Sequence, residues 1–537
     1  MIIVAMPPGY QGTDPFPLER RTGERGTGVV QASTVSVRAE RPRLASIFPA
    51  AAFATAGWIS VLGVAFAGLT LGFFAWYYVL VPMHRAMLSE IGLPASILAG
   101  IAAALALWQA YASYFVHRSG IKLERSLQYD ALSWMCFALL WLSFVLPLSI
   151  THGGRMLVVS ATLFGLIKLG IAARFNQTVR DVLIDFAITR FAIVVIAELA
   201  AVIIGQRAGS HVAESSHLLL AVWGRWDAVH YLDIASIGYH GTDMAFFPLY
   251  PFLIAILGKF TGNHLIAGLL ISNAAFFFGL LYLYKWVEHE FDRGVARRAI
   301  FYISIFPTAV FFSAVYTEAL FFALTVASFY YIREHKWLLG GIIGLFAALA
   351  RVEGILLVIP FLIEWYSAYR SGARALFRPA IAVCLIPLGL AIYMGYLWVL
   401  GGDPLYFSHV QIHWNRHLAP PWVAIGHSLN LLTHAHAAQT VANQILEIAF
   451  TALMVGVLIA GYRRLRPSAS AYMALSILVP MSTSSLMSMP RFALVLFPMF
   501  TILALWGQKP AVNNVIVALA LPLLGLFTVL FADWYWV

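Results

Sequence analysis

Charged residues are scarce in this chain. They make up 11% of its 537 residues, against about a quarter in an ordinary soluble domain, whereas hydrophobic residues make up 61%. Many apolar runs approach the roughly 20 residues needed to cross a bilayer core, such as 97–114, 265–286 and 512–531. A chain that crosses repeatedly must satisfy its backbone within each crossing segment, so α-helices are expected. The sequence therefore predicts an all-α polytopic membrane protein with about 13–15 spans.

Cysteine is also scarce, and the usual nucleotide-binding motifs are missing. The two cysteines, Cys136 and Cys384, both fall inside predicted spans, which excludes a disulfide framework and a thiolate metal site. There is neither a Gly-rich phosphate loop nor the acidic cluster that is typical of nucleotide-sugar enzymes. The sequence indicates no cofactor. A divalent metal is compatible with the chemistry but is not required by it, and no metal-ligating residues are predicted.

The predicted spans divide the chain into three regions. Residues 1–45 are rich in Gly, Pro, Arg and Thr and are expected to form a disordered basic cytoplasmic tail. Residues 46–180 form an extra N-terminal four-span region of unknown role, and residues 181–537 form the membrane core. The spans expected from residue 156 onward are 156–173, 186–206, 263–285, 299–315, 317–332, 337–350, 354–369, 380–400, 443–462, 469–488, 492–507 and 512–532.

The basic residues predict which side of the membrane each loop occupies. The tail and alternate loops, down to 463–466 and Lys509, hold 24 of the 34 lysines and arginines, and the opposite side holds eight. This bias follows the positive-inside rule and places the loops 207–262 and 401–442 outside the cytoplasm. The net charge of +10 is therefore explained by topology and by contact with membrane lipids, and no nucleic acid is expected.

Residues 223–251, WGRWDAVHYLDIASIGYHGTDMAFFPLYP, are the most polar and aromatic stretch beside a predicted span. Asp227 and His230 are three residues apart, so on a helix they share a side. Tryptophans such as Trp226 favour the membrane–water interface. The pattern indicates a short amphipathic helix that presents Asp227 at the outer surface. In the alternative reading, Asp227 pairs with Arg225 or caps a helix.

Other charged residues stand at span junctions on the same predicted side. They are Glu318, Arg351, Glu353 and Arg491. Such charges are costly at the edge of a membrane domain unless they are paired or functional. Glu318 and Arg351 are compatible with a structural ion pair. Arg351 and Arg491 are also suited to bind a phosphate, because a guanidinium can donate two hydrogen bonds to it. The sequence leaves both roles open.

The loop 401–442 adds a second polar group. It contains Gln411, Trp414, Arg416 and six histidines. His409, His413 and His417 are four residues apart and are expected to line one helix face if the loop is helical. Because Asp403 is the only acidic residue in the loop, neutral interfacial histidines are the preferred reading over a metal site.

Several blocks together resemble the PIG-V family, the second mannosyltransferase of GPI-anchor assembly, and its prokaryotic relatives. The blocks are WDAVHYLDIASIGY with AFFPLYP, SIFPTAVFFSAVYTEALFFALTVASFYY, LGGIIGLFAALARVEGILLVIP and, more weakly, VQIHWNR, MPRFALVLFP and the closing WYWV. The resemblance covers residues 184–537. It implies a GT-C-type multi-span bundle whose extracytoplasmic loops carry short amphipathic helices.

The resemblance also implies an activity. We expect a membrane hexosyltransferase that transfers mannose or another hexose from a polyprenyl-phosphate sugar to a lipid or glycolipid acceptor. The transfer is expected to be an inverting single displacement outside the cytoplasm. Asp227 matches the acidic residue of the family's WD motif and is expected to be the catalytic base. The expected substrate and donor contacts are Trp226, His230, Tyr239, Phe247, Pro248, Glu318, Arg351, Arg491, Gln411 and Trp414.

Two other classes compete with this interpretation: a polytopic secondary transporter, and a non-catalytic membrane assembly subunit. A transporter is expected to show inverted repeats and charges at the membrane midplane, and neither pattern is found in the sequence. The four extra spans of 46–180 depart from the family pattern and leave the acceptor undetermined. The prokaryotic relatives favour a bacterial or archaeal plasma membrane over the endoplasmic reticulum.

Overall fold

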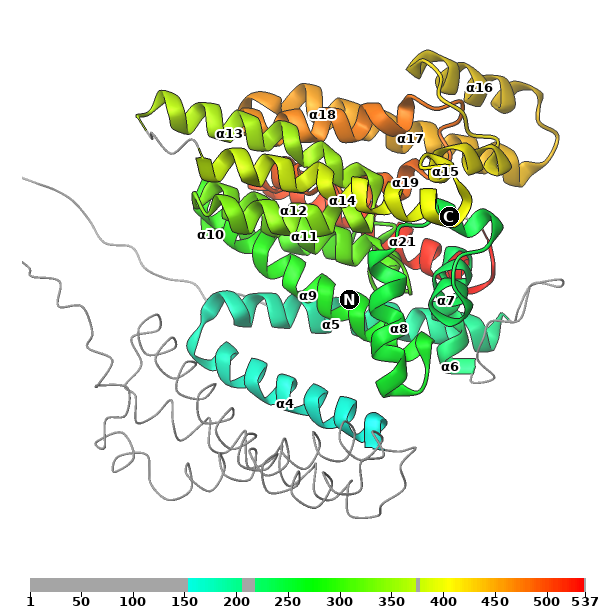
Figure 1. Cartoon of the computed structure of the whole chain (residues 1–537), viewed down its shortest axis with the longest axis horizontal. Helices are drawn as coiled ribbons and strands as arrows, with labels where there is room; N and C mark the ends of the chain where they lie inside the picture. The colour runs from blue at the N-terminus through cyan, green and yellow to red at the C-terminus, as the bar shows by residue number, and fades with distance from the viewer. Residues whose placement is uncertain (1–152, 205–217, 373–376, 536–537) are drawn as a thin grey trace, which may run out of the picture. The chain divides into compact units, whose positions relative to one another are not determined.

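The computed structural model describes residues 153–204, 218–372 and 377–535, all within one compact unit of residues 55–537 (Figure 1). The predicted tail 1–45 and the first three extra spans lie outside the described residues. In chain order the helices are α4 (Gly153–Phe175), α5 (Gln177–Ile203), α6 (Leu218–Ala221), η4 (Val222–Gly224), α7 (Asp227–Ile237), η5 (Gly241–Ala245), α8 (Leu249–Thr261), α9 (His264–Glu290), α10 (Arg293–Ser304), η6 (Ala309–Phe312), α11 (Glu318–Arg333), α12 (Trp337–Ala350), η7 (Val352–Leu357), α13 (Val358–Arg370), α14 (Phe377–Gly401), α15 (Tyr406–His409), η8 (Val410–Trp414), α16 (Pro421–His434), α17 (Ala438–Gly461), η9 (Tyr462–Arg464), α18 (Pro467–Met481), α19 (Met489–Leu494), α20 (Phe497–Trp506) and α21 (Pro510–Ala532), where η denotes a 3₁₀ helix.

The helical membrane architecture predicted from composition is confirmed. Six helical segments of the described residues are long and apolar enough to cross a membrane: Gln177–Ile203, His264–Glu290, Val352–Arg370, Phe377–Gly401, Ala438–Arg464 and Pro510–Ala532. Shorter apolar helices, including α8, α12, α18 and α20, pack among them. The described part of the chain contains no β-strand, only a bridge between Leu418 and Thr483.

Three of the predicted spans are wrong in detail. The segments expected at 299–315 and 492–507 are each broken into two short helices, and the one expected at 469–488 ends at Met481. Proline explains the two breaks. Pro307 follows the end of α10, and Pro498 is the second residue of α20, in the first turn, where its missing N–H is tolerated. Hydropathy is continuous through both breaks, so a composition window cannot detect them.

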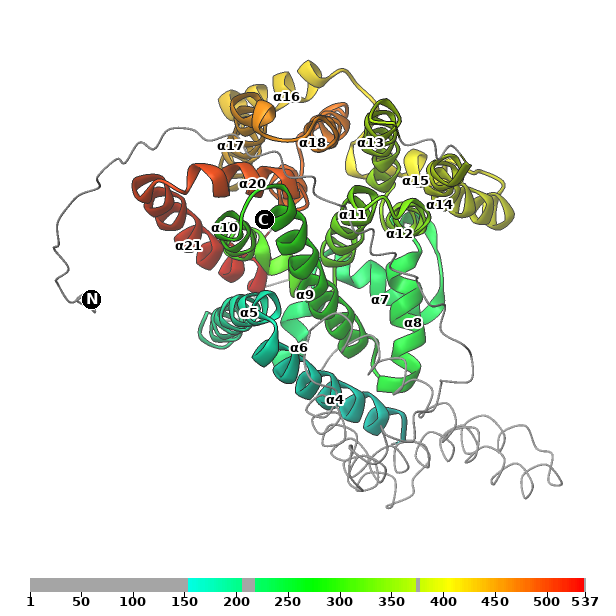
Figure 2. The same ribbon diagram turned by 90° about the vertical axis from the view of Figure 1, so that its left-hand side faces the viewer.

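Glycines allow the closest helix contacts in the bundle. A Cβ added at Gly341 of α12 would lie 2.7 Å from the Cα of Ala382, and one at Gly389 of α14 would lie 2.3 Å from the carbonyl oxygen of Leu345. Small residues of this kind let membrane helices approach backbone to backbone. Figure 2 shows α12 and α14 side by side next to α11. This tight pair supports the junction after α12, where Arg351 stands.

A buried arginine of α5 stabilises the break between α10 and α11. Irregular backbone at membrane depth needs internal hydrogen-bond partners. Arg190, only 5% exposed, donates to the carbonyl oxygens of Ser304 and Ala309, each at 2.8 Å, and to Ser313 Oγ at 3.2 Å. The break carries the chain directly to Glu318. Arg190 therefore fixes the segment on which a predicted site residue stands.

Candidate functional site

The first site residue, Asp227, begins α7 immediately after a strained residue. Trp226 has φ 58° and ψ −126°, a backbone conformation that a residue other than glycine adopts at a cost of about 1–3 kcal/mol. Its ring packs against Trp534 near the C-terminus, with ring centroids 5.7 Å apart. The turn leaves the Asp227 carboxylate in the first turn of α7, facing α19.

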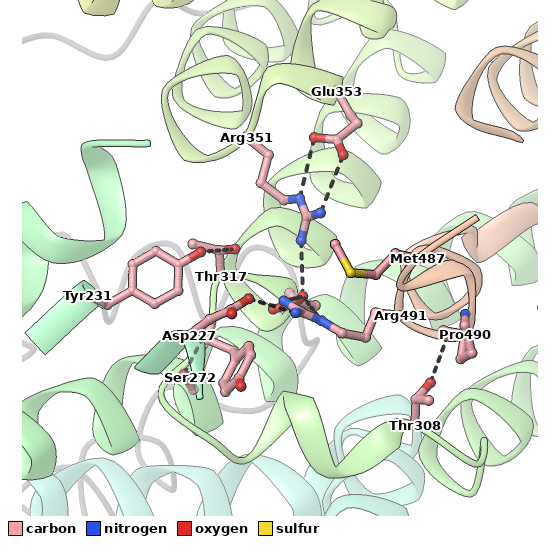
Figure 3. Close-up of polar contacts among 12 residues, drawn as sticks. Asp227, Tyr231, Ser272, Thr308, Thr317, Arg351, Glu353, Met487, Pro490 and Arg491 are labelled. Atoms are coloured by element: carbon pink, nitrogen blue, oxygen red, sulfur yellow. Dashed lines mark hydrogen bonds and ion pairs between the residues drawn. The ribbon is translucent and has the colours of Figure 1, made fainter. Parts of the chain in front are cut away.

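Asp227 pairs with Arg491 across 264 residues of sequence. Arg491 Nη1 donates to Asp227 Oδ2 at 2.6 Å (Figure 3). The short helix α19 that carries Arg491 is fixed at both sides: Thr308 Oγ1 donates to the carbonyl oxygen of Pro490 at 3.0 Å, and the Glu447 carboxylate accepts from the backbone N–H groups of Ser488 and Met489, each at 2.8 Å. Arg491 is thus held in place before any substrate arrives.

Glu318, the first residue of α11, connects both site arginines. Its Oε1 accepts from Arg491 Nη2 at 2.6 Å and Arg491 Nε at 3.1 Å, and from Arg351 Nη1 at 3.1 Å. Its side chain is fully buried. A buried carboxylate of this kind is stable only with its partners in place.

Arg351 occupies the junction between α12 and η7 and contacts a second carboxylate. Its Nη2 lies 3.3 Å from Glu353 Oε1, and its Nε donates to Glu353 Oε2 at 3.4 Å. Burial lowers the pKa of an arginine, but the neighbouring carboxylates raise the pKa of Arg351, through Glu353 and Glu318, and that of Arg491, through Glu318 and Asp227. Both guanidinium groups therefore stay charged, and both are paired with acids.

The network borders a cavity of about 390 Å³. On its other sides the cavity is lined by the 401–418 loop and by the end of α18 and the segment after it. The residues that line it include Asp227, Tyr231, Phe246, Phe247, Thr317, Arg351, Glu353, Phe407, Ser408, Gln411, Trp414, Arg416, His417, Thr483, Ser488 and Arg491. The wall combines apolar rings with a few convergent charges, which is the usual composition of a small-molecule site.

One cavity wall is aromatic. The His230 ring stacks on Phe246 at 4.5 Å between centroids, and Trp414 meets Phe246 edge-on at 6.2 Å. His230 Nδ1 lies 2.7 Å from Asp243 Oδ1, which fixes the orientation of the imidazole. The Tyr231 hydroxyl shares a hydrogen bond of 3.1 Å with Thr317 Oγ1. Because burial raises the pKa of Tyr231, its hydroxyl stays protonated and is excluded as a base.

The structure gathers most of the predicted site residues around this cavity. Six of them line it: Asp227, Phe247, Arg351, Gln411, Trp414 and Arg491. Glu318 lies beneath them in the charge network. The other four, Trp226, His230, Tyr239 and Pro248, do not line it, but two of them contact the lining residue Phe246: Tyr239 donates to its carbonyl oxygen at 2.9 Å, and the His230 ring stacks on its ring.

Two local expectations are corrected. Asp227 does not pair with Arg225, whose guanidinium is buried and lies 5.5 Å from the Trp534 ring. The three histidines of the loop do not share a helix face, because His409 ends α15, His413 lies in the following 3₁₀ turn and His417 lies beyond it. Within the described residues no group of three or more His, Cys, Asp or Glu side chains is placed to hold a metal ion.

Sequence reasoning did not select Glu353, Arg416 or Tyr231 as site residues. A signal for each was present. Glu353 follows Arg351 by two residues, Arg416 ends the block VQIHWNR, and Tyr231 lies one helical turn after Asp227. Which junctions meet across the bundle is decided by tertiary packing, so residue spacing alone could not rank them.

Comparison with known families bears on this site. The family Mannosyltransferase (PIG-V) matches residues 165–363. The resemblance to the PIG-V family is confirmed. The match spans Asp227, Glu318, Arg351 and Glu353, and it supports a membrane glycosyltransferase. A comparison with curated proteins gives no match.

The PIG-V match supplies only part of the cavity. It begins at residue 165, inside the last of the four extra spans expected from the sequence, and it ends at residue 363 within α13. Gln411, Trp414, Arg416 and Arg491 come from the chain after the match. The PIG-V segment therefore contributes the carboxylates of the cavity, and the chain after it contributes Arg416, Arg491 and other lining residues.

Proposed function

We propose that this protein transfers mannose, or another hexose, from a polyprenyl-phosphate sugar to a lipid or glycolipid acceptor outside the cytoplasm. The observation that carries the proposal is the network of Asp227, Arg491, Glu318, Arg351 and Glu353 at the wall of one cavity. It combines a carboxylate that a substrate can reach with arginines that ion pairs hold in place. The PIG-V match supports the sugar chemistry.

Exposure selects Asp227 as the base. Its side chain is 23% exposed, whereas Glu353 is 12% exposed and Glu318 is fully buried. A carboxylate takes a proton only if the hydroxyl that gives it can come within hydrogen-bond reach. Arg491 holds Oδ2 and so orients the carboxylate toward the cavity. Asp227 is the member of the network that an acceptor hydroxyl can approach.

The proposed reaction is a single displacement. The acceptor oxygen attacks the anomeric carbon of the sugar while its proton passes to Asp227. The bond between the anomeric carbon and the phosphate oxygen breaks, and its electron pair leaves with the polyprenyl phosphate. The products are an inverted glycosidic bond, polyprenyl phosphate and a protonated Asp227. Arg491 keeps the Asp227 carboxylate in position for this step, and Arg351 and Arg491 together hold Glu318.

The charge distribution along α11 supports an extracytoplasmic site. The helix starts at Glu318 in the network and ends at Arg333, and Lys336 follows on that far side. Basic residues favour the cytoplasmic side of a membrane protein. If the Arg333 end faces the cytoplasm, the cavity faces the other side. A donor linked to a membrane lipid carries no nucleotide, so an enzyme that uses it does not need a nucleotide-binding pocket.

A transfer assay tests this proposal. Purified protein in detergent is incubated with radiolabelled polyprenyl-phosphate mannose and a membrane lipid extract, with wild type beside Asp227→Ala. We expect label in a new lipid product with wild type only. Transfer from a nucleotide sugar but not from the lipid-linked donor would contradict the donor class, and equal transfer by the variant would contradict the role of Asp227.

A further inference from the structure

Three arginines line the cavity, and they differ in what neutralises them. Arg351 contacts Glu318 and Glu353, and Arg491 contacts Asp227 and Glu318. An anion that bound to either guanidinium would have to displace a carboxylate that already holds it. Two of the three positive charges at the cavity are thus already compensated by the protein.

The charge of the third arginine, Arg416, is not compensated. Its Nη2 donates to the carbonyl oxygen of Met487, and its buried Nε has no hydrogen-bond partner. In the described part of the chain no carboxylate forms an ion pair with it. Glu447, Asp227 and Glu353 attract it from a distance, but the two oxygens of Glu447 already accept from the backbone of Ser488 and Met489, and Asp227 and Glu353 are ion-paired with Arg491 and Arg351. The Arg416 side chain is only half-buried, so its guanidinium can be reached by an anionic ligand that supplies the missing partner.

Electrostatics agree with this description. Burial lowers the pKa of Arg416, whereas carboxylates raise the pKa values of Arg351 and Arg491 above the usual arginine value. Arginine nevertheless remains protonated at neutral pH, because its ordinary pKa is above 12. The Arg416 side chain is therefore a cation with unused hydrogen-bonding capacity at a cavity wall.

Arg416 is also held in a fixed position. Residues around it are joined to the segment after α18: Leu418 forms a backbone bridge with Thr483, and Ser484 Oγ donates to the carbonyl oxygen of Asn415 at 2.8 Å. The backbone N–H of Ser484 donates to His417 O at 3.0 Å. A guanidinium that is fixed before binding loses little freedom when an anion arrives.

We infer that Arg416 binds the phosphate group of the lipid-linked substrate and of the polyprenyl phosphate that leaves after transfer. A guanidinium presents its N–H donors in a plane that matches phosphate oxygens. Asp227 lines the same cavity, so a sugar bound between them places its acceptor side at the carboxylate and its phosphate at Arg416. This assignment rests on the proposed function and moves the phosphate away from Arg351 and Arg491. Arg225 is also unpaired among the described residues, but it does not line the cavity.

Binding of polyprenyl monophosphate to the purified full chain tests the inference without requiring transfer. Tryptophan fluorescence gives the dissociation constant for wild type, Arg416→Gln, Arg416→Lys and Arg463→Gln, whose exposed arginine follows α17. We expect Arg416→Gln to weaken binding about 10- to 100-fold, the usual worth of a charged hydrogen bond. Arg416→Lys retains part of the affinity, and Arg463→Gln binds like wild type.

Two comparisons show that the phosphate and its lipid are what is recognised. Polyprenol, which lacks the phosphate, should bind wild type and Arg416→Gln equally. Inorganic phosphate should compete only at concentrations far above those of polyprenyl phosphate. If inorganic phosphate binds wild type as tightly as polyprenyl phosphate does, assignment to a lipid phosphate is overturned. Thermal unfolding midpoints of all variants verify that each is folded.

The failures of the two proposals are distinguishable. If wild type binds polyprenyl phosphate and transfers sugar, but Arg416→Gln binds the phosphate equally well, the role of Arg416 is overturned and the proposed function stands. A loss of phosphate binding in Arg351→Gln or Arg491→Gln alone would likewise overturn the role of Arg416, and it would identify the arginine that binds the phosphate. If wild type binds no polyprenyl phosphate, the proposed function falls together with this inference.

Discussion

The two ends of α11 carry two charge clusters with opposite properties. At its start, Glu318 belongs to the network that borders the cavity. At its end, about 22 Å away at 1.5 Å per residue, Arg333 belongs to a second cluster, which we call the rim cluster. The rim cluster consists of Glu290, Arg333, Glu364 and Arg466. Both clusters join segments that are far apart in the sequence.

The rim cluster is balanced and geometrically complete. Arg333 Nε donates to Glu290 Oε1 at 2.5 Å, and Arg466 holds Glu364 with two hydrogen bonds of 3.0 and 3.1 Å. Ser468 Oγ also donates to Glu364 Oε1. Two acids meet two bases, which is what a structural clamp between helices requires.

The cavity network is neither balanced nor closed. It joins three carboxylates to two arginines, leaves Asp227 partly exposed, and faces the unpaired Arg416. The C-terminal end of α11 thus belongs to a structural ion-pair cluster, and its N-terminal end belongs to the network that we propose to be catalytic. Charge balance and access to a cavity, rather than the number of charged residues, separate the two roles.

The largest effect is expected from breaking the cavity end at Glu318. Glu318→Gln leaves Arg491 and Arg351 without their shared carboxylate. We expect a loss of about 3–5 kcal/mol in the free energy of unfolding, typical of removing one partner of a buried ion pair. Transfer should fall about 10²- to 10³-fold. Glu334→Gln, at the other end of α11, is the matched control in unfolding and transfer assays, and it should match wild type in rate.

A substitution of Arg190 tests whether the position of Glu318, at the start of α11, depends on the irregular segment between α10 and α11. Arg190→Met removes the donors to the carbonyl oxygens of Ser304 and Ala309. Leaving two buried carbonyl groups unpaired should cost about 2–4 kcal/mol. Thermal unfolding measures the loss, and Arg190→Lys, which keeps the charge but not the fork, should be intermediate. An unchanged midpoint would mean that the break is held by other contacts.

The smallest effect is expected at the rim. Arg466→Gln breaks the pair with Glu364, but the arginine is 30% exposed, and water screens part of the interaction. We expect a loss of about 1 kcal/mol in stability and a transfer rate within about twofold of wild type. A tenfold loss of transfer in a folded Arg466→Gln protein would contradict the claim that the rim cluster is structural and that only the cavity network takes part in the reaction.

The sequence predicted the helical membrane architecture and six of the residues that line the cavity. The helices α9, α12, α14 and α21 follow the expected spans to within a few residues, since each of these apolar runs forms one helix, in α14 and α21 despite an internal proline. Asp227, Arg351 and Arg491 could be selected because a charge beside an apolar span is costly and therefore meaningful. These signals are local in the sequence.

Pairing and exposure could not be predicted from the sequence. Asp227 and Arg491 are 264 residues apart, and which arginine reaches which carboxylate depends on how the broken helices pack. The hypothesis that Arg351 and Arg491 contact phosphate was made without knowing which carboxylates neutralise these arginines in the folded chain. Arg416 differs from them only in lacking such a partner, which is a property of the folded chain.

The central claim is that Asp227 accepts the acceptor's proton. Its most direct test is the single-turnover transfer rate with saturating polyprenyl-phosphate mannose, for Asp227→Asn beside Asp233→Asn on the same helix. We predict a fall of about 10²- to 10⁴-fold for Asp227→Asn with unchanged donor affinity, and a rate within about twofold of wild type for Asp233→Asn. A wild-type rate for Asp227→Asn, or an equal loss in both variants, would contradict the claim.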